Sequence, residues 1–276
     1  MKKLGIVVTL IVIIGAVWGL LRTKSDEAKI EKLVLTGSST VAPLAAEIGK
    51  RFESLHRYVR VDVQTGGSSR GVSDARAGLA DIGMASRALK DDEKDLLQFT
   101  IALDGISIIL NKANLVEALN KRQIIDIYTG KIVNWKDVGG NDAPITVVNK
   151  AEGRSTLELF LHYFGLKNTE VKPQVIIGDN QQGIKTVVGN PDAIGYVSVG
   201  TAEYEASQGA AIKLLPLEGI AASVENVRNR SFPLSRPLNL VTRVEPAGIA
   251  KDFVEFARSP QVNDLIEAQY FVPVPH

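Results

Sequence analysis

Short apolar segments alternate with longer amphipathic segments along most of the chain after residue 31. The apolar segments that predict strands lie at 33–35, 59–63, 80–84, 101–110, 145–148, 193–197, 212–215 and 238–241. Apolar residues at helical spacing, or short polar stretches between turns, predict helices at 41–55, 70–77, 90–97, 115–119, 122–128, 157–164, 183–188, 247–257 and 260–270. Strand and helix alternate repeatedly, and this order predicts an α/β fold of mostly parallel sheets flanked by helices.

The N-terminus has a different pattern. Lys2 and Lys3 precede an apolar run at 4–21 that has no polar face. A basic start and an apolar centre are typical of an export signal, and a run of about 18 residues is near the lower limit for spanning a bilayer. Trp18 lies where a small residue would mark a cleavage site. Residues 1–30 are therefore predicted to be a signal peptide or an uncleaved membrane anchor, with the rest of the chain outside the cytoplasm.

Three predicted strands end in turns rich in glycine and hydroxyl residues, at 36–40, 65–71 and 149–156. Each turn leads into a predicted helix. Free backbone N–H groups and the helix dipole make such a turn a suitable anion site. Ligands of α/β sheets bind at the carboxyl ends of strands, where all three turns lie. The third turn is far from the first two in sequence, so a cleft between two α/β lobes brings them together most simply.

Composition limits the classes of function. The 276 residues have a net charge of +1 and include no cysteine. A nearly neutral chain has no general attraction for nucleic acid or an anionic membrane, so anion binding must be local. The lack of cysteine excludes disulfides, thiolate metal sites and cysteine catalysis. No group of aspartates and histidines has the spacing of metal ligands, and no cofactor is predicted.

One motif favours an enzyme instead. Residues 67–71 match Gly-x-Ser-x-Gly and lie between a predicted strand and a predicted helix, as a hydrolase nucleophile does. Such an enzyme also needs an acid and a histidine further along the chain. The histidines that follow are His162, within an apolar helix, and His276, the terminal residue. Neither position suits a general base, so the chain is predicted not to be an enzyme.

Several longer motifs occur in one characteristic order. They are Gly-Ser-Ser-Thr-Val-Ala-Pro-Leu at 37–44, Thr-Gly-Gly-Ser-Ser-Arg-Gly-Val at 65–72, Ala-Asp-Ile-Gly-Met-Ala-Ser-Arg at 80–87, Ile-Tyr-Thr-Gly-Lys-Ile-Val-Asn-Trp at 127–135, Ala-Ile-Gly-Tyr-Val at 193–197 and Phe-Pro-Leu-Ser-Arg-Pro-Leu at 232–238. With these motifs the chain resembles, over residues 32–273, the phosphate-binding proteins of high-affinity phosphate ABC importers. These belong to the type II periplasmic binding proteins.

The resemblance implies an architecture and a function. Two lobes, 31–105 plus 240–276 and 106–239, would be joined by two crossing strands with hinges near 103–110 and 238–242. The protein would capture inorganic phosphate outside the cytoplasmic membrane and deliver it to ABC transporter permease subunits, acting as a monomer. Two alternatives would use the same site: a membrane-tethered phosphate sensor or scavenger, and a receptor for another tetrahedral oxyanion.

The resemblance also implies the residues that hold phosphate. The candidates are Ser39, Thr40, Val41, Ser68, Ser69, Ser86, Arg87, Lys150, Arg154, Ser155 and Thr156. For each serine and threonine the alternative role is that of a helix N-cap. Arg70, beside the second turn, is either a further ligand or a helix-surface residue.

Three candidates depart from the family pattern. Lys150 stands where the family usually has arginine and Arg154 where it usually has serine, so Arg154 either replaces the lost planar guanidinium or faces solvent. Ser86 stands where one branch of the family has an aspartate that accepts the proton of phosphate. Serine donates as readily as it accepts. We therefore expect weaker rejection of sulfate, with Arg87 adding charge to the site.

Overall fold

A computed structural model describes residues 30–275. The predicted signal or anchor segment therefore lies almost wholly outside the described residues. Among these residues, no helix is both long enough and apolar enough to cross a membrane. Residues from Lys32 onwards form one compact unit.

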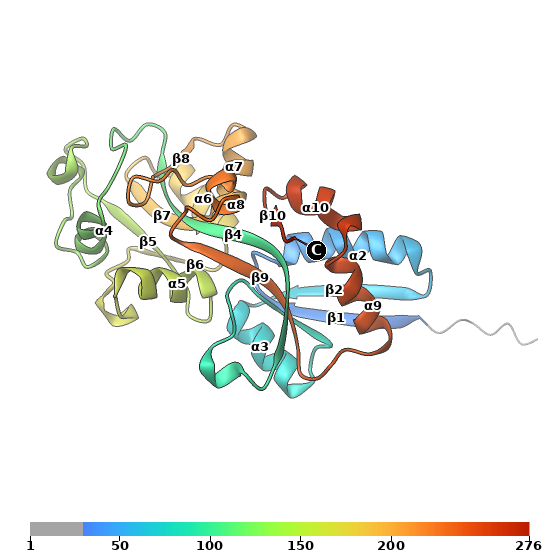
Figure 1. Cartoon of the computed structure of the whole chain (residues 1–276). Coiled ribbons are helices and arrows are strands. Elements are labelled where there is room, and N and C mark those ends of the chain that lie inside the picture. The colour runs from blue at the N-terminus through green and yellow to red at the C-terminus, as the bar shows by residue number, and fades with distance from the viewer. Residues whose placement is uncertain (1–29, 276) are drawn as a thin grey trace, which may run out of the picture. The chain divides into compact units, whose positions relative to one another are not determined.

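One mixed sheet runs through this unit in the order β2-β1-β3-β9-β4-β7-β5-β6, with β8 and β10 also paired to β4 (Figure 1). The strands are β1 (Glu31–Gly37), β2 (Val59–Thr65), β3 (Ile82–Ala85), β4 (Leu97–Asn111), β5 (Thr146–Lys150), β6 (Val175–Ile177), β7 (Ala193–Ser198), β8 (Ile212–Leu214), β9 (Ser235–Thr242) and β10 (Val272–Pro273). The helices are α2 (Ala42–Leu55), α3 (Ser68–Ala77), α4 (Lys121–Tyr128), α5 (Ser155–Phe164), α6 (Asn180–Gly189), α7 (Val199–Ser207), α8 (Val224–Arg228), α9 (Gly248–Ala257) and α10 (Asn263–Ala268).

The sheet is parallel at both ends and antiparallel in the middle. β1 pairs with β3, and β5 pairs with β6 and β7, in parallel. The long strands β4 and β9 pair antiparallel with each other and with their neighbours β3 and β7. The α/β prediction is confirmed, but the expectation of mostly parallel sheets does not extend to the two joining strands.

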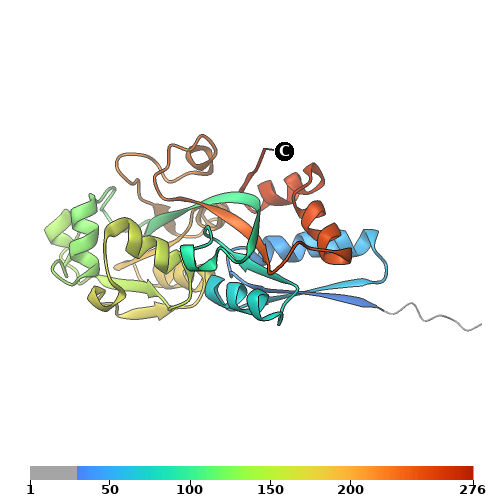
Figure 2. The same ribbon diagram turned by 60° about the horizontal axis from the view of Figure 1, so that its bottom comes forward.

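Separate hydrophobic cores define two lobes. Lobe one packs β1, α2, β3 and α9 around one core, and lobe two packs α4, β5, α5 and β7 around another. β4 contributes Ile101 and Ala102 to the first core and Ile106 and Ile108 to the second. Figure 2 shows β4 and β9 passing together from one lobe to the other. The predicted lobe boundaries and hinges remain predictions, and this passage of β4 is where the first hinge is expected.

Two predicted helices are wrong. The segment at 90–97 contains only a short 3₁₀ turn, Asp91–Glu93, before β4 begins at Leu97. The segment at 115–119 has no regular structure. There the side chains of Asn111 and Asn114 accept hydrogen bonds from backbone N–H groups two residues on, and this local bonding competes with a helix. The sequence did not predict β6, α7, α8 or β10.

Candidate functional site

The three glycine and hydroxyl turns meet between the lobes. The first follows β1 and begins α2, the second follows β2 and begins α3, and the third follows β5 and begins α5. Gly67 allows the second and third turns to lie in contact. Its φ is +96°, and a Cβ there would lie 2.6 Å from the carbonyl oxygen of Gly153. Turns that belong to different lobes are thus in direct contact.

These turns line a small polar cavity together with the residue that follows β3. Its lining residues are Ser38, Ser39, Thr40, Gly67, Ser68, Ser86, Arg154, Ser155 and Thr156. The volume is about 10 Å³, close to the space of one water molecule. A tetrahedral oxyanion is larger, so the cavity must widen to hold one. The structure brings seven of the eleven predicted ligands to this cavity: Ser39, Thr40, Ser68, Ser86, Arg154, Ser155 and Thr156.

Hydroxyl groups from both lobes bond to one another at the cavity. Ser155 Oγ of lobe two lies 2.9 Å from Ser68 Oγ and 2.6 Å from Ser86 Oγ, both of lobe one. Ser38 Oγ donates to Ser86 Oγ at 3.0 Å. Each hydroxyl both donates and accepts. The same groups can therefore turn their O–H donors toward an anion when the lobes are apart.

A buried arginine at the base of the cavity was missed in the sequence. Arg236 on β9 is 2% exposed, and its guanidinium donates to Asp104 Oδ2 on β4 at 3.1 and 2.8 Å. The outer nitrogens reach the hydroxyls: Nη1 donates to Thr156 Oγ1 at 2.9 Å and to Ser86 Oγ at 3.4 Å, and Nη2 donates to Thr40 Oγ1 at 3.4 Å. A positive charge thus lies directly behind the cavity hydroxyls.

Asp104 holds this arginine in place. Its other oxygen, Oδ1, accepts hydrogen bonds from Ser198 Oγ at 2.9 Å and from the N–H of Gly200 at 3.2 Å. The signals in the sequence were Asp104 within the apolar segment at 101–110 and Arg236 in the motif at 232–238, just before the predicted strand at 238–241. A buried charge in a strand normally has a partner, but sequence alone did not show that the two strands are neighbours.

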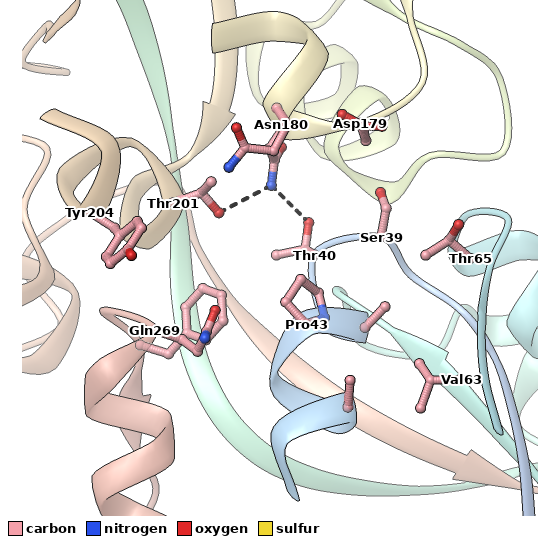
Figure 3. A pocket seen from close by; sticks show the side chains of 14 residues that line it. Ser39, Thr40, Pro43, Val63, Thr65, Asp179, Asn180, Thr201, Tyr204 and Gln269 are labelled. Carbon is pink, nitrogen blue, oxygen red and sulfur yellow. Dashed lines mark hydrogen bonds between the residues drawn. The ribbon is translucent and has the colours of Figure 1, made fainter. Parts of the chain in front are cut away.

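Lys150 lies one side chain away from the cavity. Its Nζ donates to Asn180 Oδ1 at 2.9 Å, and Asn180 Nδ2 in turn donates to Thr40 Oγ1 at 3.3 Å. Figure 3 shows Asn180 between Thr40 and Thr201, with dashed lines to both. Burial, helped by the positive charge of Arg236, lowers the pKa of Lys150 to about 7. The lysine therefore acts on the site through Asn180.

Arg154 is the charged candidate that lines the cavity itself. Its Nε is buried and has no hydrogen-bond partner among residues 30–275. An unpaired buried donor is costly, and an anion would satisfy it. This position is consistent with the prediction that Arg154 replaces the family's usual arginine.

Like Lys150, three further candidates do not line the cavity. Arg87 is bound by Glu93 through two hydrogen bonds of 2.6 and 2.8 Å and forms an ion pair with Glu158. Ser69 Oγ donates to the same Glu158 at 3.1 Å. The N–H of Val41 already donates to Ser38 Oγ at 3.3 Å. Arg87 and Ser69 thus contact lobe two beside the cavity, and their predicted role as anion ligands stays a prediction.

A wider pocket of about 450 Å³ adjoins the cavity at Ser39 and Thr40 (Figure 3). Residues of α2, α6 and α7 line it, among them Pro43, Asn180 and Tyr204. This pocket is the broader, partly apolar part of the space between the lobes.

Two α/β lobes joined by paired strands, with a polar cavity between them, define a solute-binding protein fold. A family model described as a PBP superfamily domain matches residues 22–261. The chain belongs to the PBP superfamily.

Within that superfamily it is similar to phosphate-binding proteins. The chain is similar to the phosphate-binding protein PstS of Bacillus subtilis (strain 168), with 28% identity over 264 residues, 92% of this chain and 86% of the relative. A putative phosphate ABC transporter substrate-binding protein from Clostridium perfringens, solved with bound phosphate, has a TM-score of 0.82 and 34% identity over 89% of this chain and 100% of its own. An ABC-type phosphate transport receptor from Vibrio cholerae has a TM-score of 0.71 and 31% identity over the same shares.

Proposed function

We propose that this protein binds inorganic phosphate between its lobes, outside the cytoplasmic membrane, and delivers it to an ABC transporter permease as a monomer. The observation that carries the proposal is Arg236, a buried cation whose outer N–H groups donate to hydroxyls from both lobes. The similarity to phosphate-binding proteins of ABC transporters supports phosphate as the anion and transport as the role.

The mechanism that fits these residues is binding without chemistry. In the separated lobes, Ser68 and Ser86 lie on one side of the cleft and Ser155 and Thr156 on the other. Closure surrounds the anion with O–H donors, with Arg154 and Arg236 supplying positive charge. Hydrogen bonds to a charged oxygen in a dry cavity are stronger than in water, so the closed form binds the anion tightly.

One observation keeps other tetrahedral oxyanions in consideration. Among the described residues, no carboxylate lines the cavity. The nearest one along the hydrogen-bond network, Asp104, is occupied by Arg236, Ser198 and Gly200. A carboxylate acceptor is what would reject an anion without a proton, so we propose that sulfate is excluded less strictly here.

Calorimetric titration with phosphate, sulfate, arsenate and molybdate tests both points. We expect a phosphate Kd below about 100 μM, which corresponds to roughly −5.5 kcal/mol, and measurable competition by millimolar sulfate. Weaker phosphate binding than this would overturn the proposed ligand. Absence of sulfate competition would overturn only the relaxed selectivity. Permease and ATPase genes beside the gene for this protein would favour transport over a sensing or scavenging role.

A further inference from the structure

An acidic residue on α5 joins the two lobes beside the cavity. Glu158 belongs to lobe two and lies one turn after Ser155. Its charged partners belong to lobe one: Oε2 lies 2.8 Å from Arg87 Nε and 3.0 Å from Lys90 Nζ. Its other oxygen accepts the hydrogen bond from Ser69 Oγ. One side chain of lobe two thus contacts three side chains of lobe one.

In lobe one, Glu93 holds the Arg87 side chain in position for this contact. The Arg87 side chain is 3% exposed and is bound on its outer nitrogens by Glu93, which leaves Nε toward lobe two. Hydrogen bonds from Arg87 and from the N–H of Lys90 keep the pKa of Glu93 below its ordinary value despite the opposing effect of burial. Glu93 is therefore ionised at neutral pH, and it keeps Arg87 in position.

The charges balance only when the lobes are together. Without Glu158, the ion pairs of this contact leave two cations of lobe one, Arg87 and Lys90, with one carboxylate, Glu93. Glu158 brings the missing negative charge. A backbone hydrogen bond runs beside this group, because the N–H of Ser69 donates to the carbonyl of Gly153 at 3.2 Å. The second turn and the third turn are thus hydrogen-bonded to each other at the edge of the cavity.

We propose that Glu158, with Ser69, Arg87 and Lys90, forms a latch that holds the lobes closed and sets the rate of anion release. This inference rests on the proposed function, because it concerns the same cavity. α5 carries both Ser155, which lines the cavity, and Glu158, which closes the latch. A single movement of α5 therefore brings the anion ligands and the latch into place together.

The latch acts on release more than on capture. Its ion pairs exist only in the closed form, so they raise the fraction of closed molecules both with and without the anion. An anion enters the open form, where the latch is apart. When about half of the anion-free molecules are closed, removing the latch raises the association rate by less than about twofold, whereas the dissociation rate from the mostly closed complex rises by the full factor.

Glu158→Gln is the direct test, since it keeps the size of the side chain and removes its charge. We expect ³²P-phosphate to leave the variant about fivefold faster, the effect of roughly one partly exposed ion-pair network. Lys90→Gln should give a smaller increase in the same direction, because the Lys90 side chain is 47% exposed and that of Arg87 is 3% exposed. Association rates should stay within about twofold of the original.

The matched control is Glu255→Gln, which removes a carboxylate from the Lys251–Glu255 ion pair within α9 of lobe one. It should change neither rate. A double variant of Glu158 and Lys90 should accelerate release less than the product of the single effects, because both remove one network. Release from Glu158→Gln at the original rate, or equal changes in both rates, would overturn the latch.

Small-angle scattering without phosphate separates this inference from the proposed ligand. Glu158→Gln should have a larger radius of gyration than the original protein, while Glu255→Gln should match the original. Equal radii for Glu158→Gln and the original would contradict the latch whatever the anion. Failure of the original protein to bind phosphate would contradict only the proposed function.

Discussion

At the scale of single residues, the site is organised by one buried ion pair. Arg236 and Asp104 are both excluded from solvent, and each is held by further hydrogen bonds. Removal of one member of such a pair leaves the other charge buried without compensation. The pair therefore serves the fold as well as the cavity, and a useful substitution must keep the charge.

Arg236→Lys is such a substitution. Lysine keeps the positive charge but cannot bond Asp104 through two nitrogens and also reach Thr40 and Thr156. We expect calorimetry to show phosphate binding weakened by roughly tenfold to a hundredfold, about 1.4 to 2.8 kcal/mol. Urea unfolding serves as the control for stability. A Kd within twofold of the original would contradict a role for the guanidinium in anion binding.

Lys150 gives the stability of the protein a pH dependence. Its pKa is about 7 in the folded chain and 10.5 for an ordinary lysine, so between these values the unfolded chain binds more protons. Stability contributed by this group therefore rises as the pH rises from about 7. Lys150→Met removes the cost of burying the charge. We expect the variant to gain stability relative to the original more at pH 6 than at pH 9, measured by urea unfolding; a gain independent of pH would contradict this.

The residues that the sequence identified are those whose role is local. Ser68, Ser155 and Thr156 line the cavity because each begins a helix directly after a turn, and that pattern is visible in the chain. Arg87 could not be assigned in this way. Whether its side chain faces an anion or Glu158 depends on a carboxylate of the other lobe. Arg236 was missed for the same reason, since its role depends on the pairing of β9 with β4, which places it opposite Asp104.

At the scale of elements, the turns supply the cavity residues, and the helices that they begin differ in how well the sequence predicted them. Strands and helices with strong periodicity were predicted well, including α5, which ends at Gly165 in the left-handed conformation. The segment at 90–97 failed because Glu93 binds Arg87 and the backbone of Lys90 in place of continuing a helix. The acidic residues of this segment include one member of an ion pair. Sequence periodicity does not distinguish acidic residues that form ion pairs from those that begin a helix.

Gly67→Ala tests the contact between the second and third turns. The added Cβ would meet the backbone carbonyl of Gly153, which cannot swing aside, so the lobes would close less completely. We expect phosphate binding to weaken about tenfold or more, on the order of 1.4 kcal/mol. Calorimetry of phosphate binding is the measurement.

Gly78→Ala is the matched control for this change. Gly78 ends α3 with a φ of +70°, and a Cβ there would meet nothing within 4 Å. It should cost about 1 kcal/mol of stability and leave phosphate binding unchanged. Equal effects of the two variants on binding would show that backbone strain, not contact between the turns, is responsible.

At the scale of the whole molecule, the two-lobed α/β architecture could be predicted, but its mixed sheet could not. The order of strands and turns along the chain indicates lobes and a cleft. The direction of β4 and β9 relative to their neighbours depends on pairings between distant segments, such as Gly83 with Val241. No local pattern carries that information.

Anion binding should be visible as stabilisation of the whole unit. A ligand that binds only the folded form stabilises it by about 2.7 kcal/mol at a free concentration of 100 times Kd. We therefore expect phosphate to raise the Tm and to reduce the radius of gyration as the lobes close. Arg236→Lys should need proportionally more phosphate for the same rise. A Tm that is independent of phosphate at saturating concentration would contradict binding to the folded form.

The position of Arg236 on a joining strand has a consequence for how an anion is captured. The arginine is carried by β9 and fixed to β4, the strands shared by both lobes, so its charge stays at the floor of the cleft when the lobes part. A diffusing anion meets this charge before the two sets of hydroxyls have come together. Asp104 offsets this charge at long range, so the field of the pair acts close to the cleft, and the association rate should fall only modestly as ionic strength rises.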